Sequence, residues 1–223
     1  MINIIFLGAP GSGKGTQSAL LAENLKIPNI STGEILRKEV TAQSEIGNLA
    51  KSYMNSGGLV PDQVVVDIIK KRIAEADCNQ GFILDGFPRN FEQAEILEKM
   101  LNEVQKKIHL VVNIEVNDEV LVKRISGRFS CKKCGTVYNR FFSQTKIENI
   151  CDKCGGSEFE SRSDDNEETV KNRLKVYNQN TAELIELYRK KGLIYSVDGL
   201  KNIALVNLEI NQAVNSIISN NNN

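Results

Sequence analysis

Residues 8–17 have the sequence Gly8-Ala9-Pro10-Gly11-Ser12-Gly13-Lys14-Gly15-Thr16-Gln17. An apolar run, residues 2–7, precedes this segment and a helical pattern, residues 18–25, follows it, which is the context of a phosphate-binding loop. The glycines let backbone N–H groups turn inward around an anion, and the positive end of the next helix points at the same place. Lys14 adds a compact charge that can follow a phosphoryl group. A plain glycine-rich surface turn would need this spacing and both flanks to coincide by accident.

Gly15 stands where such loops usually carry the Ser or Thr that binds Mg²⁺ directly. Either Thr16 takes that role, or the metal is held mainly through water.

The composition is that of a soluble globular chain. Its 223 residues, 41% hydrophobic and 25% charged, suffice for one core with small inserted units. The net charge is zero, so nothing suggests a nucleic acid or an acidic membrane as partner. The first residues lack the basic region of a signal peptide, and no apolar run reaches the roughly 18 residues of a membrane span. We therefore expect a cytoplasmic protein.

Apolar runs alternate with helical patterns along most of the chain, which is typical of a parallel sheet covered on both faces. We expect an α/β core with a five-stranded parallel sheet, its apolar runs being residues 2–7, 81–85, 108–116, 193–197 and 203–206. Ser31 with Glu34 fits a capping box that starts a helix. Long helical patterns cover residues 167–190 and 209–219.

Two segments interrupt this alternation. Residues 31–60 form a small helical excursion, called here the insert. Residues 127–164 contain short β-like pieces, four cysteines and polar loops, and are called here the lid. The remaining residues, 1–30, 61–126 and 165–223, are expected to form the core domain.

Asp85 and a set of arginines are the candidates for chemistry around the phosphate loop. Asp85 ends an apolar strand, and ligands of such sheets bind beyond the carboxyl ends of the strands, where a carboxylate can hold Mg²⁺ directly or through water. Arg124 and Arg128 are four residues apart and are expected on one helical face. Arginine neutralises phosphoryl groups bidentately, and the arginines at element junctions are Arg37, Arg89, Arg124, Arg128, Arg162 and Arg173.

No nucleophile–base pair is visible, which is consistent with phosphoryl transfer, where positioning and electrostatics do most of the work.

Four of the five cysteines stand in two C-x-x-C pairs, each followed by glycine. In a reducing compartment this spacing favours a metal over disulfides. A tetrahedral structural zinc site fits best, with Cys131, Cys134, Cys151 and Cys154 as ligands.

Together these motifs resemble the adenylate kinase family in its long form with a zinc-bearing lid, over essentially residues 1–215. The matching segments are Gly8 to Gln17, Ser31-Thr32-Gly33 with Arg37, Asp85-Gly86-Phe87-Pro88-Arg89 with Gln93, Arg124 to Arg128, and Arg162-Ser163-Asp164-Asp165 with Arg173. The resemblance implies a P-loop core, a monophosphate-binding insert and a zinc-ribbon-like lid. It further implies a monomer and reversible transfer of a phosphoryl group from Mg·ATP to AMP, giving two ADP, in adenine nucleotide homeostasis.

The resemblance also implies site residues. Those implied for ATP are Gly11, Ser12, Gly13, Lys14, Gly15, Thr16, Arg124, Val137, Tyr138 and the backbone of Lys201. Those implied for AMP are Thr32, Arg37, Gly58, Leu59, Val60, Gly86, Phe87, Pro88, Arg89 and Gln93, with Arg162 and Arg173 at the phosphates. The family pattern itself has glycine after the lysine, which favours a water-mediated Mg²⁺ near Asp85.

Two alternatives remain open. A kinase for UMP or CMP shares the loop and the Asp85–Arg89 motif, although such enzymes usually have a short lid, and Thr32 with Gln93 is the adenine-type combination. The same hypothesis of a nucleoside monophosphate kinase also leaves open that GTP is the phosphoryl donor. A nucleic-acid-binding zinc ribbon is the second alternative, since the lid carries Lys132, Lys133, Arg140, Phe141 and Phe142.

Overall fold

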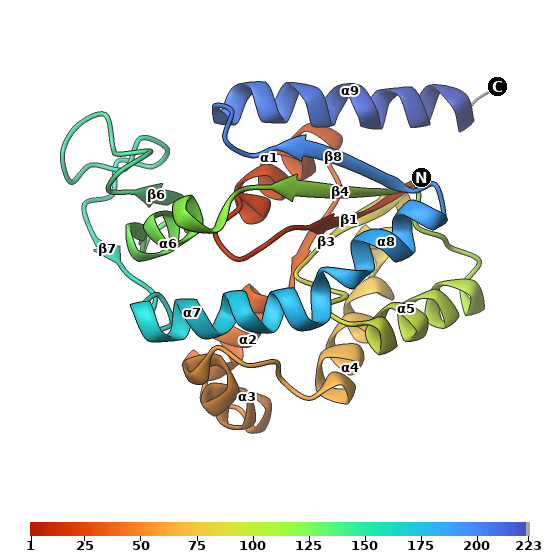
Figure 1. The fold of residues 1–223 in the computed structure, drawn as a ribbon, viewed down its shortest axis with the longest axis horizontal. Helices are drawn as coiled ribbons and strands as arrows, with labels where there is room; N and C mark the ends of the chain where they lie inside the picture. Colours follow the sequence, from red (N-terminus) through yellow and green to blue (C-terminus); the bar gives the residue numbers. More distant parts are fainter. Residues whose placement is uncertain (222–223) are drawn as a thin grey trace.

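A parallel five-stranded sheet forms the centre of the molecule, as the sequence predicted, although one of its strands is Asn29–Ser31 in place of the predicted strand at residues 203–206 (Figure 1). The computed structural model describes residues 1–221. The strand order is β2-β3-β1-β4-β8, and every neighbouring pair is parallel. The strands are β1 (Ile2–Leu7), β2 (Asn29–Ser31), β3 (Gly81–Asp85), β4 (Leu110–Glu115) and β8 (Ile194–Asp198).

Helices cover both faces of this sheet because its central strands are apolar on both sides. Ile4 and Phe6 of β1 belong to one core cluster, whereas Ile5 and Leu7 belong to the other, as alternation along a strand requires. The first cluster includes residues of α1 (Lys14–Leu25) and α9 (Ile203–Asn221). The second includes residues of α4 (Asp62–Ile73), α5 (Phe91–Glu103) and α8 (Glu183–Lys190). A short 3-10 helix, Ala76–Gln80, leads from α4 into β3.

The insert is a pair of helices, α2 (Thr32–Thr41) and α3 (Glu45–Ser56). Gly47 lets the two helices approach closely, since a Cβ there would lie 2.1 Å from the carbonyl oxygen of Glu39. In Figure 1 the pair lies below the sheet, next to α4.

The lid follows α6 (Asp118–Ser126) and is a small antiparallel sheet at the opposite end of the molecule from the N-terminus (Figure 1). Its strands, in the order β6-β5-β7, are β5 (Arg128–Cys131), β6 (Val137–Asn139) and β7 (Phe159–Glu160). The rings of Phe129, Tyr138 and Phe159 pack together with centroids 5.4–5.9 Å apart. The sequence therefore predicted the character of this segment correctly.

The helix predicted over residues 167–190 contains an irregularity. It consists of α7 (Glu167–Val176), a π-helical segment (Tyr177–Thr181) and α8. The N–H of Ala182 donates to the carbonyl oxygen of Tyr177, 3.1 Å away, instead of to a residue four positions back.

Three local predictions were wrong. Residues 203–206 are not a strand but the first turn of α9, because the Asn202 side chain accepts a hydrogen bond from the Leu205 N–H and caps the helix. The Ser31–Glu34 capping box does not form, because Ser31 makes no capping hydrogen bond and the Glu34 carboxylate accepts from Arg37 and Arg162 instead. Arg128 does not share a helical face with Arg124, because α6 ends at Ser126 and Arg128 already belongs to β5.

Within the described part of the chain, no helix combines the length and apolarity needed to cross a membrane.

Candidate active site

The phosphate loop lies between the carboxyl end of β1 and the start of α1, as predicted. Gly8 and Gly11 have positive φ angles of 139° and 82°. A Cβ at Gly8 would lie 2.6 Å from the carbonyl oxygen of Ile114, and one at Gly11 would lie 2.7 Å from Cγ1 of Ile125. Larger residues would therefore push the loop away from β4 and α6. Gly13, at φ 103°, precedes α1 and leaves its N-terminus open to an anion.

Lys14 turns back into the loop, where its Nζ donates to the carbonyl oxygens of Gly8 at 2.6 Å and Ala9 at 3.0 Å. Burial lowers the pKa of Lys14 to about 8; the nearby Asp85 opposes this shift, and Arg89 adds to it. The ammonium group thus lies in a place that disfavours its charge. A phosphate anion there would relieve this penalty.

Asp85 lies beside the loop, at the end of β3. Its Oδ2 would be 3.4 Å from a Cβ placed on Gly15. The structure therefore places this carboxylate next to the phosphate loop.

Several arginines are gathered around Lys14. Burial, together with neighbouring arginines, lowers the pKa of Arg89 and of Arg162 to about 10, and burial also lowers that of Arg173. Arg124 donates to the carbonyl oxygens of Gly199, at 2.8 Å, and Ser12, at 3.4 Å, and so touches the phosphate loop from α6. Crowded cations of this kind form an anion site.

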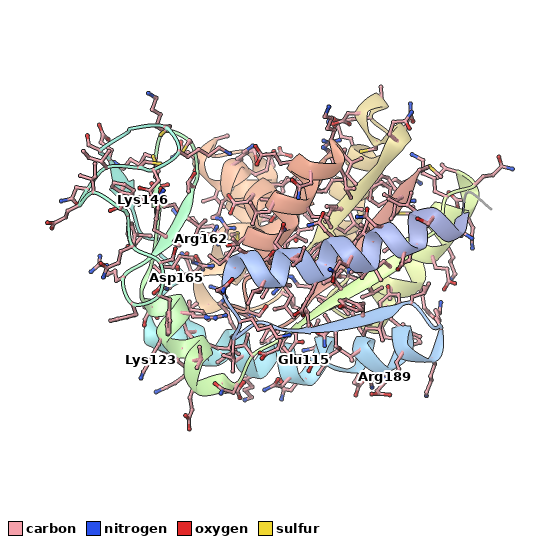
Figure 2. All side chains as sticks on the ribbon, turned by 90° about the horizontal axis from the view of Figure 1, so that it is seen from above. Glu115, Lys123, Lys146, Arg162, Asp165 and Arg189 are labelled. Atoms are coloured by element: carbon pink, nitrogen blue, oxygen red, sulfur yellow. The ribbon has the colours of Figure 1, made fainter. Side chains whose placement is uncertain are left out.

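Carboxylates partly balance these arginines. Arg128 donates to both oxygens of Asp165, and Arg173 donates to Asp164 at 2.9 Å and to Asp165 at 3.2 Å. Figure 2 shows Arg162 and Asp165 near each other where the lid joins the core. The sequence analysis names Asp164 and Asp165 only within the segment Arg162-Ser163-Asp164-Asp165, and nothing local in the sequence reveals that they pair with arginines.

Glu34 of the insert accepts hydrogen bonds from Arg37, at 2.7 Å, and from Arg162 at the end of the lid. Burial works against its charge, but these arginines hold the pKa of Glu34 below its ordinary value. One carboxylate thereby connects two arginines that were predicted to bind phosphate.

A pocket of about 70 Å³ lies between the insert and the core. Most of the residues predicted for AMP line it, namely Thr32, Arg37, Gly58, Leu59, Val60, Gly86, Arg89 and Gln93, together with Arg173. Phe87 instead packs fully buried in the core, behind the cis peptide that joins it to Pro88. The sequence analysis did not identify Leu36, Met54 and Val65, which supply apolar wall.

A second pocket, of about 100 Å³, joins the phosphate loop to the first. One side of this pocket is lined by Gly8, Pro10 and Lys14. Another side is lined by Pro88, Arg89 and Arg173. The π-helical segment closes it with Tyr177 and Thr181, and the Thr181 hydroxyl donates to the Arg89 carbonyl oxygen at 2.7 Å. The two pockets are adjacent, since Gly57, Leu59, Gly86, Arg89 and Arg173 line both of them.

The remaining residues predicted for ATP lie on two other segments. The loop before Lys201 reaches the phosphate loop, since a Cβ on Gly199 would lie 3.1 Å from the Ser12 carbonyl oxygen. In the lid Val137 is exposed, whereas Tyr138 is buried and its hydroxyl donates to Sγ of Cys151, 3.4 Å away. The Tyr138 side chain is therefore engaged inside the lid, and its residue pairs with Phe129 of β5.

The four lid cysteines converge as their spacing predicted. Their Sγ atoms all lie within 4.8 Å of one another. Two of the separations are 3.6 Å, from Cys131 to Cys154, and 3.5 Å, from Cys134 to Cys151. Four sulfurs at about 2.3 Å from a tetrahedral zinc ion would be about 3.8 Å apart, so the cluster fits the ion. Gly135 and Gly155, at φ 71° and 68°, form the predicted turns after each pair.

Comparison with known proteins gives a consistent result. The family profile described as adenylate kinase matches residues 6–193. A protein of Archaeoglobus fulgidus named adenylate kinase is 52% identical over 98% of this chain and 100% of its own length. Adenylate kinases of Methanosarcina barkeri and Limosilactobacillus fermentum are 51% and 45% identical, over 94% and 98% of this chain and 96% and 100% of their own lengths.

Proposed function

This chain belongs to the adenylate kinase family and is a nucleoside monophosphate kinase that acts on ATP and AMP, and we propose the following roles for its residues. The observation that carries the proposal is a pair of adjacent pockets with Arg89 and Arg173 in the wall of both, one bordered by the phosphate loop with Lys14 and the other by the insert. A donor phosphate on the loop and an acceptor phosphate near Arg37 and Arg89 would meet there.

Lys14 follows the phosphoryl group as it moves, because a flexible side chain with one charge can stay with it. The burial of Lys14 makes its charge more stabilising toward an anion than it would be in water. Neutralisation of the transition state is completed by the arginines, namely Arg89, Arg124, Arg128, Arg162 and Arg173. No general base is assigned, since the AMP phosphate is already an anionic nucleophile.

ATP lies along the loop residues Gly11 to Thr16, with Arg124, the lid segment at Val137 and Tyr138, and the Lys201 backbone around its nucleoside. Closure of the lid excludes water, so that the phosphoryl group passes to AMP and not to water. Mg²⁺ bound together with ATP would supply electrostatic stabilisation of the phosphate charge. Asp85, next to Gly15, is the carboxylate in position to hold it through its waters.

The lid cysteines bind a structural zinc ion. Four thiolates would complete the shell of the metal and leave no open position for a substrate. The cluster of Phe129, Tyr138 and Phe159 with the cysteines is small, so the ion would substitute for a larger apolar core.

The domain assignment follows from these roles: residues 31–60 bind the monophosphate, residues 127–164 form the lid, and the rest forms the core. We further propose a cytoplasmic monomer without nucleic-acid or membrane partners, since thiolate zinc ligands suit a reducing compartment. The alternative of a nucleic-acid-binding zinc ribbon would require that the protein binds single-stranded nucleic acid and has no kinase activity.

A panel of nucleoside monophosphates tests the proposal. ADP formation should be far faster with AMP than with UMP or CMP, with ATP as donor and GTP as the comparison donor. Faster turnover of UMP or CMP would replace this assignment with the pyrimidine alternative.

A further inference from the structure

The amide of Gln93, which lines the acceptor pocket, is held in one orientation by two protein groups. Its Oε1 accepts a hydrogen bond from the backbone N–H of Arg89 at 2.7 Å. Its Nε2 donates to Oδ1 of Asp62 at 2.7 Å. Gln93 is 1% exposed, so these partners are not replaced by water.

Asp62 is itself fixed. It stands in the first turn of α4, where helix geometry favours a carboxylate. Both of its oxygens accept from Nδ2 of Asn90, at 2.9 and 3.2 Å, and Asn90 caps α5 through the N–H of Gln93. The carboxylate therefore joins the starts of two helices beneath the pocket.

These contacts make a flip of the Gln93 amide costly. A backbone N–H can only donate, and a carboxylate can only accept. Exchange of Oε1 and Nε2 would set an oxygen against Asp62 and an N–H against the Arg89 N–H, which loses two buried hydrogen bonds. A primary amide has two N–H groups and two lone pairs. Among the described residues, one N–H and one lone pair of Gln93 have no protein partner, and they can meet a ligand.

We propose that Asp62 is a specificity-determining residue, which makes the acceptor site select adenine over 6-oxopurines by fixing the Gln93 amide. The inference rests on the proposed AMP site. Adenine carries an acceptor at N1 and a donor at the 6-amino group, which matches a free N–H beside a free lone pair. Hypoxanthine carries the reverse, a donor at N1 and an acceptor at O6. Asp62 touches no substrate, and it acts as a positioning residue.

The test compares AMP with IMP as acceptors, at saturating ATP, in the full-length enzyme with Asp62→Asn. Asparagine has nearly the same shape but can present an N–H to a flipped Gln93. We expect a higher KM for AMP, a nearly unchanged KM for ATP, and a rise of about tenfold or more in the kcat/KM ratio of IMP to AMP.

Two further variants separate specificity from structure. Asp67→Asn is the matched control, because Asp67 lies on the same helix and accepts from a glutamine, Gln63 at 2.8 Å, but on the exposed side. It should leave the ratio unchanged. Asp62→Glu keeps a group that only accepts, so it should keep the ratio near the wild-type value even if its KM values rise. It also serves if Asp62→Asn does not fold.

The outcomes are distinct. An unchanged IMP to AMP ratio in Asp62→Asn would overturn the inference, as would an equal loss with every acceptor, which indicates a structural role. A raised ratio in Asp62→Glu would also overturn it, whether or not Asp62→Asn folds, because glutamate can still only accept from the Gln93 amide. A wild-type enzyme that does not prefer AMP would instead contradict the proposed function itself.

Discussion

Replacement of Lys14 by methionine should stabilise the nucleotide-free protein at neutral pH while nearly abolishing turnover. Burial lowers the pKa of Lys14 from an ordinary value of 10.5 to about 8, and Asp85 only partly compensates. Below pH 8 this lysine is protonated in both the folded and unfolded states, and the folded state bears the full cost of the buried charge. Methionine has a similar length and no charge.

The magnitude follows from the pKa difference. A change from 10.5 to about 8 corresponds to about 3 kcal/mol of folding free energy for a fully enclosed group. Lys14 is half-buried, so water screens part of the cost, and we expect about 1–3 kcal/mol. Between pH 8 and 10.5 the unfolded chain binds a proton that the folded one does not, so wild-type stability rises with pH across this window.

Denaturant unfolding at pH 7.5, 9 and 10.5 measures the effect. Lys14→Met should be more stable than wild type at pH 7.5, and its advantage should shrink toward zero at pH 10.5. Lys70→Met, at an exposed position of α4, is the control for general effects of pH and charge. A stability difference that is the same at all three pH values would refute the reasoning. Activity within about tenfold of wild type, equal to about 1.4 kcal/mol, would show that Lys14 does not serve the phosphate site.

Two other perturbations test different parts of the site. Arg89→Ala should lower kcat/KM for AMP by about a hundredfold or more, since it removes a buried phosphate partner, and should change ATP affinity little; equal losses of both affinities in a binding titration would mean that Arg89 is misassigned. Replacement of Cys151 and Cys154 by serine, or removal of metal by a chelator, should lower the melting temperature and loosen the lid while phosphoryl transfer persists at low temperature. Complete loss of activity in a preparation shown to be metal-free by elemental analysis, with the core still folded by circular dichroism, would contradict a structural zinc.

The sequence predicted the sheet and the phosphate loop because their signals are local. A glycine-rich loop between an apolar strand and a helix can form in few ways, and the cysteine spacing brings four sulfurs together almost by itself. The incorrect prediction of a strand at residues 203–206 rested only on a short run of apolar residues. Val206, Ile210 and Val214, all buried, repeat every four residues and would have indicated a helix that begins earlier.

The pairing of charges could not be predicted, because it depends on residues far apart in the chain. Glu34 and Arg162 are 128 positions apart, and Arg128 and Asp165 are 37 apart. Each acidic residue also fits a local role as a helix cap or first-turn charge, and that role accounts for it fully at the level of sequence. Only the fold shows which role it takes.

The π-helical segment joins α7 and α8 into one continuous helix, and it decides which side chains of each part face the rest of the protein. Before it, Val170 and Leu174 pack against α6, near Arg173; after it, Leu184 and Tyr188 pack into the main core. An extra residue in a helix shifts the angular position of everything beyond it by about 100°. The inserted residue thus lets α7 keep the orientation that packs on α6, while α8 keeps the orientation that packs into the main core. A related protein without the extra residue would need different packing either against α6 or in the main core. Among related proteins, the number of residues in this stretch should therefore vary much less than their identity.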